Sequence, residues 1–318
     1  MTAAVALAGY ALLAGVVAPA VLSRARWPHR APAVGVLAWQ GLMVTFVVST
    51  ALAVYHLVVR EHHVHDGFLG LLSACGLAPD APTAPTATTA TTALTGDSSP
   101  FGAAAALLAP AAIVLLPSAW LVRTVARTRR ARRRHLDLLT LVGRPAPEYG
   151  ATVVEHGVPA VYCLPGRSCR VVVTRGALDV LSEEQLRAVL EHERGHLVGR
   201  HHLLHMETEA FALAFPGLPL ARHAKEQTAL LLEMAADDRA LRSHPREVLA
   251  AAMCEVAGGQ APRAALGAAG AGGAGALIRL RRVLAPQPEP HRVTWLGIVA
   301  ASVLAPLLPL FLACGPAV

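Results

Sequence analysis

The stretch LSEEQLRAVLEHERGH, residues 181–196, decides the fold of the chain around it. Ser182 and Gln185 have the spacing of a helix-capping box, and leucine and valine follow them at helical period. We therefore expect a helix over about 183–209, with the histidines of the stretch well inside it.

Two of these histidines, His192 and His196, are four positions apart. A helix turns about 100° per residue, so both side chains lie on one face, about 6 Å apart along the axis. That spacing suits two imidazoles on one metal ion. Glu193 lies at the edge of the same face, where a carboxylate can take a proton from water. The pattern predicts zinc-assisted hydrolysis with Glu193 as the general base.

A hydrolytic zinc site usually has three protein ligands, so a third is needed. Glu233 is the best choice, in a second helix expected over about 223–243. The alternative for Glu233 is a solvated helix carboxylate, but its neighbours at 230–236 are so apolar that its charge needs a partner. Asp237 follows one helical turn later and can hydrogen-bond the outer nitrogen of a liganding imidazole. We predict one Zn²⁺ per chain.

The composition indicates a membrane protein, because 54% of the 318 residues are hydrophobic and only 15% are charged. Four segments reach the length of about 20 apolar residues that crosses a bilayer: 2–22, 34–59, 101–122 and 293–312. The first resembles a cleaved signal peptide at Ala18-Pro19-Ala20. However, its arginines follow the apolar stretch instead of preceding it, which favours a retained span.

Arginine side chains flanking a span stay preferentially in the cytoplasm. They cluster at 24–30, 123–134 and 279–292, whereas 61–100 contains none. This predicts a multi-pass protein with both termini outside and the segment from His192 to His196 in the cytoplasm. The cluster at 123–134 and the net charge of +7 also suit nucleic acid, but its position beside a span favours contact with the lipid bilayer. A single lysine, Lys225, among many alanines is typical of a GC-rich bacterial genome.

The predicted fold class is a mainly α-helical integral membrane protein with four transmembrane helices and a cytoplasmic α+β zinc peptidase domain. Residues 158–164 and 170–174 are rich in β-branched side chains and predict a hairpin or two adjacent strands. The apolar run 211–220 is too short to cross and is broken by prolines, so we expect a turn between two helices near the membrane surface. A Gly/Ala tract at 258–276 predicts a linker. The domains are then 1–122, including an extracellular Thr/Ala/Pro-rich loop at 61–100, followed by 123–292 and 293–318.

The five cysteines contain no C-x-x-C pair, which argues against a zinc ribbon or a redox motif. Cys75 and Cys314 both fall on the outer side in this topology, where a disulfide is permitted, although we expect free thiols. His62, His63 and His65 form an alternative metal-binding cluster outside, without a suitably spaced cysteine or carboxylate to complete it.

Taken together, His192-Glu193-Arg194-Gly195-His196 and the run from Glu233 to Ala240 resemble the gluzincin pattern of membrane-embedded metallopeptidases. The pattern is most similar to the peptidase family of bacterial β-lactam sensor-transducers, whose relatives include the heat-shock membrane protease and CAAX prenyl protease families. The resemblance implies four spans and a cytoplasmic zinc site held by His192, His196 and Glu233. It also implies Glu193 as the base and Asp237 as a supporting residue.

The resemblance further implies an edge strand along which an extended substrate lies, formed by Val171, Val172, Val173 and Thr174. It suggests signal transduction by regulatory proteolysis, in which the substrate is a cytoplasmic winged-helix repressor or the protein itself. The sensor-transducers carry a penicillin-binding domain after the fourth span, whereas this sequence stops at Val318, so direct β-lactam acylation is not expected.

Two questions stay open at the level of sequence. The second donor for the oxyanion is unassigned, because helix phase does not place Arg200, His201, His202 and His205, and a polar helix face is the preferred interpretation of these residues. A catalytically silent zinc-binding membrane receptor is the alternative function, although structural zinc sites usually have four ligands and often include cysteine. A transporter is disfavoured, because His56 is the one obvious ionisable residue within the spans. The oligomeric state is not predicted.

Overall fold

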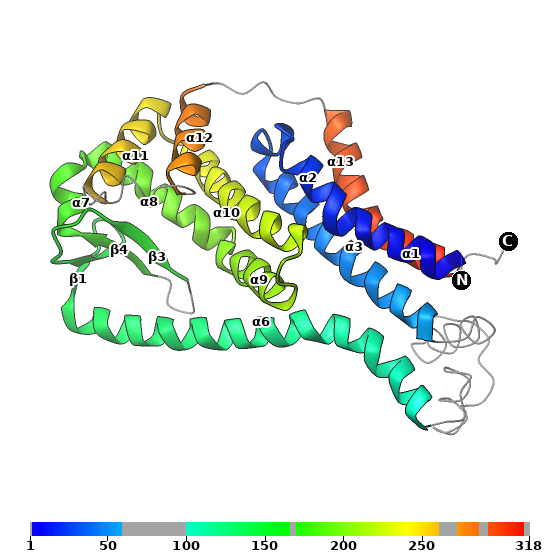
Figure 1. Cartoon of the computed structure of the whole chain (residues 1–318). Helices are drawn as coiled ribbons and strands as arrows, with labels where there is room; N and C mark the ends of the chain where they lie inside the picture. The colour runs from blue at the N-terminus through cyan, green and yellow to red at the C-terminus, as the bar shows by residue number, and fades with distance from the viewer. Residues whose placement is uncertain (1, 59–99, 166–169, 261–271, 286–291, 315–318) are drawn as a thin grey trace, which may run out of the picture.

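The computed structural model of the chain describes residues 2–58, 100–165, 170–260, 272–285 and 292–314, which are mainly helical with one small sheet (Figure 1). Four stretches, here called the membrane-length helices, are long and apolar enough to cross a membrane by length and composition: Ala3–Leu22, Pro32–Val58, Leu107–Val142 and Trp295–Ala313. The first, second and fourth agree closely with the predicted spans. The third is longer than predicted.

Several sequence predictions fall outside the described residues. Residues 61–99 of the predicted loop, with His62, His63, His65 and Cys75, are among them, and so are Cys169 and residues 261–271 of the predicted linker. The side chain of Cys314 is not described either. The outer histidine cluster and the pairing of Cys75 with Cys314 therefore stay untested.

The second membrane-length helix, α3 (Pro32–Val58), packs against the first and the fourth. The first consists of α1 (Thr2–Leu12), a π-helical turn (Leu13–Val17) and α2 (Ala18–Leu22). The fourth consists of α13 (Arg292–Leu304), a 3₁₀ turn (Ala305–Leu307) and α14 (Leu308–Cys314). Gly41 of α3 permits the closest approach, because a Cβ there would collide with the carbonyl of Ser302 in α13. The Tyr10 hydroxyl donates to the Ala305 carbonyl at 3.2 Å and joins α1 to the 3₁₀ turn.

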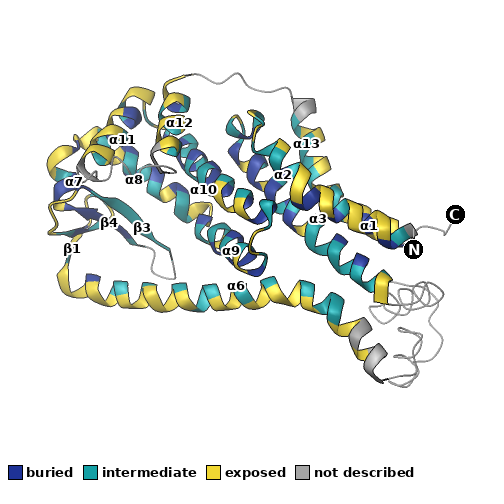
Figure 2. Cartoon of the chain, in the orientation of Figure 1, coloured by how far each residue is buried: buried dark blue, intermediate teal, exposed yellow. Residues whose placement is uncertain are grey.

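Helix α6 (Pro100–Val142) contains the third membrane-length helix and runs unbroken for 43 residues. At 1.5 Å per residue it is roughly 65 Å long, so it continues through the whole arginine cluster, and the domain boundary predicted at 122 lies inside it. It ends where Gly143-Arg144-Pro145 predicted a break. None of residues 107–122 is buried, and Figure 2 shows α6 largely exposed along its length.

After α6 the chain forms a four-stranded sheet from β1 (Gly143–Ala146), β2 (Ala151–Val154), β3 (Val161–Leu164) and β4 (Arg170–Thr174). The predicted hairpin is confirmed, because β3 pairs antiparallel with β4, with Val161 opposite Val173. The strand order is β1-β2-β4-β3, and β2 runs parallel to β4.

The sheet order corrects one prediction about the site. Val171, Val172, Val173 and Thr174 do not form an edge strand, because β4 lies between β2 and β3. The three valines are buried, and Val171 and Val173 pack into a core with helices that follow the sheet in the chain. Continuous β-branched sequence is typical of such an interior strand. The free edge on this side of the sheet is β3.

Between the sheet and α13, the described residues form α7 (Arg175–Val180), α8 (Glu183–Val198), α9 (His201–Ala214), α10 (Pro219–Ala240), α11 (Arg246–Gln260) and α12 (Gly272–Leu284). The single helix predicted over 183–209 is wrong, because the chain breaks at Arg200, whose φ of 49° is left-handed. The turn predicted within 211–220 is confirmed between α9 and α10. Helix α10 begins earlier than predicted because Pro219, with its fixed φ, suits the first helical turn.

The α9–α10 hairpin packs against α3. Phe46 of α3 meets Phe211 and Phe215 edge to face, with ring centroids 6.2 and 5.3 Å apart. Trp39 of α3 belongs to the same buried cluster as Leu231 of α10. The helix that carries Glu233 is therefore fixed directly to the second membrane-length helix.

Candidate metal centre

The capped start of α8 sets the position of the histidines. The Ser182 side chain accepts a hydrogen bond from the Gln185 backbone, and the Gln185 side chain accepts one from the Ser182 backbone at 2.8 Å, so the predicted capping box is confirmed. Leu186 and Leu190 face the core below the sheet. His192 and His196 then point toward Glu233 of α10, whereas Glu193 lies near Cys163 of β3.

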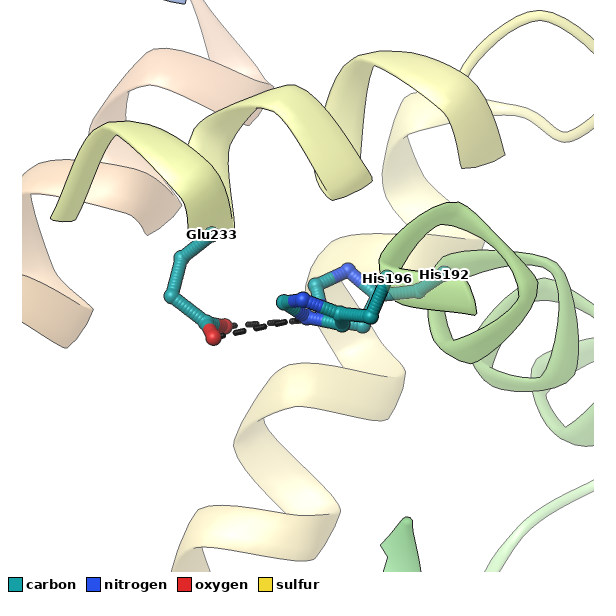
Figure 3. Close-up of side chains that lie close together, drawn as sticks. All are labelled: His192, His196 and Glu233. Atoms are coloured by element: carbon teal, nitrogen blue, oxygen red, sulfur yellow. Dashed lines mark hydrogen bonds and ion pairs between the residues drawn. The ribbon is translucent and has the colours of Figure 1, made fainter. Parts of the chain in front are cut away.

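His192, His196 and Glu233 point toward one another from α8 and α10 (Figure 3). The two imidazole Nε2 atoms are 3.2 Å apart. The Glu233 carboxylate lies 3.5 Å from Nε2 of His192 and 3.4 Å from Nε2 of His196. Atoms bound tetrahedrally to zinc at about 2.0–2.1 Å lie about 3.3 Å from each other. The three predicted ligands thus have the chemistry and the spacing that one zinc ion needs.

The close crossing of α8 and α10 makes this spacing possible. A Cβ added to Gly195 would lie 3.1 Å from the Cα of Ala236, tighter than most side-chain contacts. Gly195 lies between the two histidines in sequence, and Ala236 lies within one helical turn of Glu233. Small residues at the crossing bring the two helix backbones near enough for the ligands to meet.

A second polar atom orients each imidazole. Nδ1 of His192 lies 3.0 Å from the carboxylate of Asp237, as the helical spacing of Asp237 from Glu233 predicted. Nδ1 of His196 lies 2.9 Å from Nδ1 of His201, the first residue of α9. Such partners fix the ring and the tautomer of a liganding histidine.

The break between α8 and α9 is what brings His201 to His196. Arg200 takes the left-handed conformation, which ends α8 and lets α9 begin at His201, and a Cβ on Gly199 would collide with the His201 ring. The sequence analysis left His201 on a polar helix face, because the break carries no glycine at the left-handed position to announce it. The side chain is instead buried.

Arg279 on α12 is the site residue that the sequence analysis missed. Its Nε and Nη2 donate to the two oxygens of Asp237 at 2.9 and 2.7 Å, and its Nη1 lies 2.8 Å from Glu233. One guanidinium therefore holds both the third ligand and the residue that orients His192. The only sequence signal was an arginine on a short basic helix beyond the Gly/Ala tract.

These contacts and burial shift the pKa values of the carboxylates and histidines of the site in different directions. Burial alone would raise the pKa values of Glu233 and Asp237, but His192 and Arg279 outweigh it and hold both at about 2. Burial would lower the pKa of His192, yet its bonds to Asp237 and Glu233 raise it to about 9. The pKa values of His196 and His201 fall to about 4, chiefly because burial disfavours their charged forms.

Glu193 differs from the other two carboxylates. Burial raises its pKa above the usual value, although the charge of His192 and hydrogen bonds from Cys163 oppose the rise. Those hydrogen bonds come from the Cys163 side chain and backbone, so Glu193 lies between the metal ligands and β3. A carboxylate there, with its pKa nearer neutrality, suits proton transfer.

The fold and the site can now be compared with known proteins. Residues 125–250 match the model of Peptidase family M48. The M48 match includes all five predicted residues, from His192 to Asp237, and ends before Arg279. It supports a peptidase, and M48 peptidases typically depend on zinc. No curated protein and no solved structure matched the chain. The finer resemblance to the β-lactam sensor-transducers is not confirmed by the M48 match.

Replacing His201 by phenylalanine removes the polar partner of His196 but keeps a ring in its place. We expect the zinc affinity to fall about tenfold or more, the usual cost of losing such a partner. Competition with a zinc-binding dye measures it, with circular dichroism to verify the fold. His202→Phe, one position along α9, is the control. Equal affinities for both variants would contradict the role of His201.

Zinc binding should release a proton near neutral pH. The pKa of about 9 keeps His192 protonated in the metal-free protein, whereas the pKa of about 4 keeps His196 neutral. Zinc must therefore displace one proton, and its affinity should fall about tenfold for each pH unit below 9. Calorimetry at neutral pH in buffers of different ionisation enthalpy counts the protons. Finding none released would show that His192 is already neutral.

Proposed function

We propose that this chain is a membrane-bound, zinc-dependent endopeptidase. The observation that carries the proposal is the convergence of His192, His196 and Glu233: the two Nε2 atoms are 3.2 Å apart, and each lies 3.4–3.5 Å from one of the two Glu233 oxygens. Glu193 lies beside this group, on the helix of the two histidines. The M48 match over 125–250 supports peptide-bond hydrolysis as the reaction.

A zinc ion held by these residues supplies Lewis-acid activation of water and of the scissile carbonyl. Glu193 takes the proton from the attacking water, because burial raises its pKa and, among the described residues, no cation hydrogen-bonds it. It then passes that proton to the amide nitrogen that leaves. Asp237 and His201 hold the two imidazoles in place during these transfers.

The strand that receives the substrate is β3 in this proposal. It is an edge of the sheet, it packs against α8, and Cys163 within it hydrogen-bonds Glu193. An extended peptide that pairs with an exposed edge gains main-chain hydrogen bonds. Pairing with β3 brings the peptide backbone next to Glu193, which pairing with β4 cannot do.

The peptidase acts on the cytoplasmic face of a bacterial plasma membrane in this proposal. The four membrane-length helices and the arginines that flank them support this arrangement. A role in regulatory proteolysis, with a winged-helix repressor or the chain itself as substrate, rests on the family resemblance alone. A structural zinc site in a silent receptor is disfavoured, because such sites usually have four protein ligands and the described residues offer three.

Glu193→Gln should separate metal binding from catalysis. The amide keeps the shape of the side chain but cannot take a proton, so we expect zinc content to be unchanged and cleavage to fall by about 10²–10⁴-fold. Metal analysis and hydrolysis of a quenched fluorescent peptide measure the two properties. Glu184→Gln, in the exposed first turn of α8, is the control. Cleavage by the Glu193→Gln variant at the wild-type rate would remove Glu193 from the mechanism.

The orientation has its own test. Alkaline phosphatase, which is active only outside the cytoplasm, should be active when fused after Val318 or inserted within 61–99. It should be inactive when inserted within 261–271. Phosphatase activity of the fusion within 261–271, or no activity of the expressed fusions after Val318 and within 61–99, would contradict the proposed topology.

A further inference from the structure

A cavity of about 240 Å³ opens directly beside the metal ligands. Its walls come from α8, α11, α12 and β3, and it shares His192, Glu193 and Glu233 with the site. The remaining wall is apolar apart from Arg279 and includes Val161, Val189, Met253, Val256, Ala257 and Ala276. Any side chain that enters it lies next to the bond that is cut.

Arg279 does not give this cavity a free positive charge. Its guanidinium is shared between Asp237, with bonds of 2.7 and 2.9 Å, and Glu233, at 2.8 Å. Two carboxylates thus compensate one cation. An acidic side chain entering the cavity would lose its water without gaining an unpaired cation, and a lysine that paired with Glu193 would occupy the carboxylate that the proposed mechanism uses as its base. The chemistry of the cavity favours an apolar side chain.

The edge strand selects one substrate residue for the cavity. Val161 of β3 lines the cavity wall. Side chains of paired strands alternate between the two faces of a sheet, so a peptide added to β3 directs every second side chain to the face of Val161. The neighbours of the selected residue lie on the other face, where the cavity does not reach.

We propose that this cavity is the specificity pocket of the peptidase and accepts an apolar side chain of leucine, methionine or phenylalanine size beside the scissile bond. The inference rests on the proposed function and names its substrate class. Met253, Val256 and Ala257 on α11 and Ala276 on α12 line the pocket. Ala257 and Ala276 are both exposed, so larger side chains at these positions narrow the pocket without overpacking a core.

The test uses the zinc-loaded full chain in detergent and a mixture of peptides of random sequence, with cleavage sites mapped by mass spectrometry. We expect leucine, methionine or phenylalanine at one position next to the cut, with leucine favoured over alanine about tenfold or more. Aspartate and lysine should be absent from that position. Neighbouring positions should show no comparable preference.

Two variants and a control locate the preference in the cavity. Ala276→Phe narrows the pocket, so we expect cleavage after or before leucine to fall at least tenfold while alanine substrates are retained. Met253→Ala widens it and should shift the preference toward tryptophan. Ala251→Phe places the same bulk on an exposed face of α11 outside the cavity and should leave the profile unchanged. Zinc content should be equal in all four proteins.

The outcomes separate the two proposals. If the zinc-loaded protein cuts no peptide in the mixture, the proposed peptidase function is wrong, and the proposed specificity pocket is wrong as well. If peptides are cut without an apolar preference, or if Ala276→Phe and Met253→Ala keep the wild-type profile, the pocket assignment is wrong while the peptidase function stands.

Discussion

The structure of the site depends on a buried network in which Glu233 and Asp237 share their negative charges between His192 and Arg279. The Asp237 side chain is only 1% exposed, so water cannot stabilise its charge. Removing one partner from a buried ion pair typically costs about 3–5 kcal/mol, because the other charge is left uncompensated. The network joins α8, α10 and α12, so the ligand spacing and one wall of the cavity are consequences of one electrostatic requirement. A proton on His192 supplies part of the positive charge in the metal-free chain, and zinc takes over that role when it binds.

The helices that carry this network are also fixed to the membrane-length helices. Leu231 and Met234 lie on either side of Glu233 in sequence and pack in the same cluster as Val36 and Trp39 of α3. A second connection starts from α12, where Arg282 donates to both oxygens of Asp238 on α10. The same side chain donates, at 2.5 Å, to the carbonyl of His29, which precedes α3 in the chain. The third ligand and its arginine partner are therefore each connected to α3. These contacts give the site a direct packing link to the second membrane-length helix.

Sequence could predict the parts of the site that local geometry determines. His192, Glu193 and His196 follow from spacing within one helix, and Glu233 and Asp237 follow from one helical turn in another apolar segment. Arg279 could not be predicted, because it lies 42 positions after Asp237 and reaches it only through tertiary packing. The prediction that Val171–Thr174 form an edge strand failed for the same reason. Three valines and a threonine in a row indicate a strand, but they do not show which strands lie on either side of it. The break at Arg200 was not predicted, because an arginine in the left-handed conformation is rare and carries no sequence signal.

Three carboxylates within one small site take three different roles because their surroundings differ. Glu233 has cationic partners and is kept ionised, as a metal ligand must be, and Asp237 is kept ionised by Arg279 so that it can hold an imidazole proton. Glu193 is buried beside β3, where burial raises its pKa and Cys163, and no cationic group among the described residues, hydrogen-bonds it. When neighbouring groups of one chemical type are driven apart in pKa, the group that is easiest to protonate is the one suited to carry a proton. The environment of Glu193 thus supports the proposed role of base independently of its place between the histidines, and Glu193 also lines the apolar cavity.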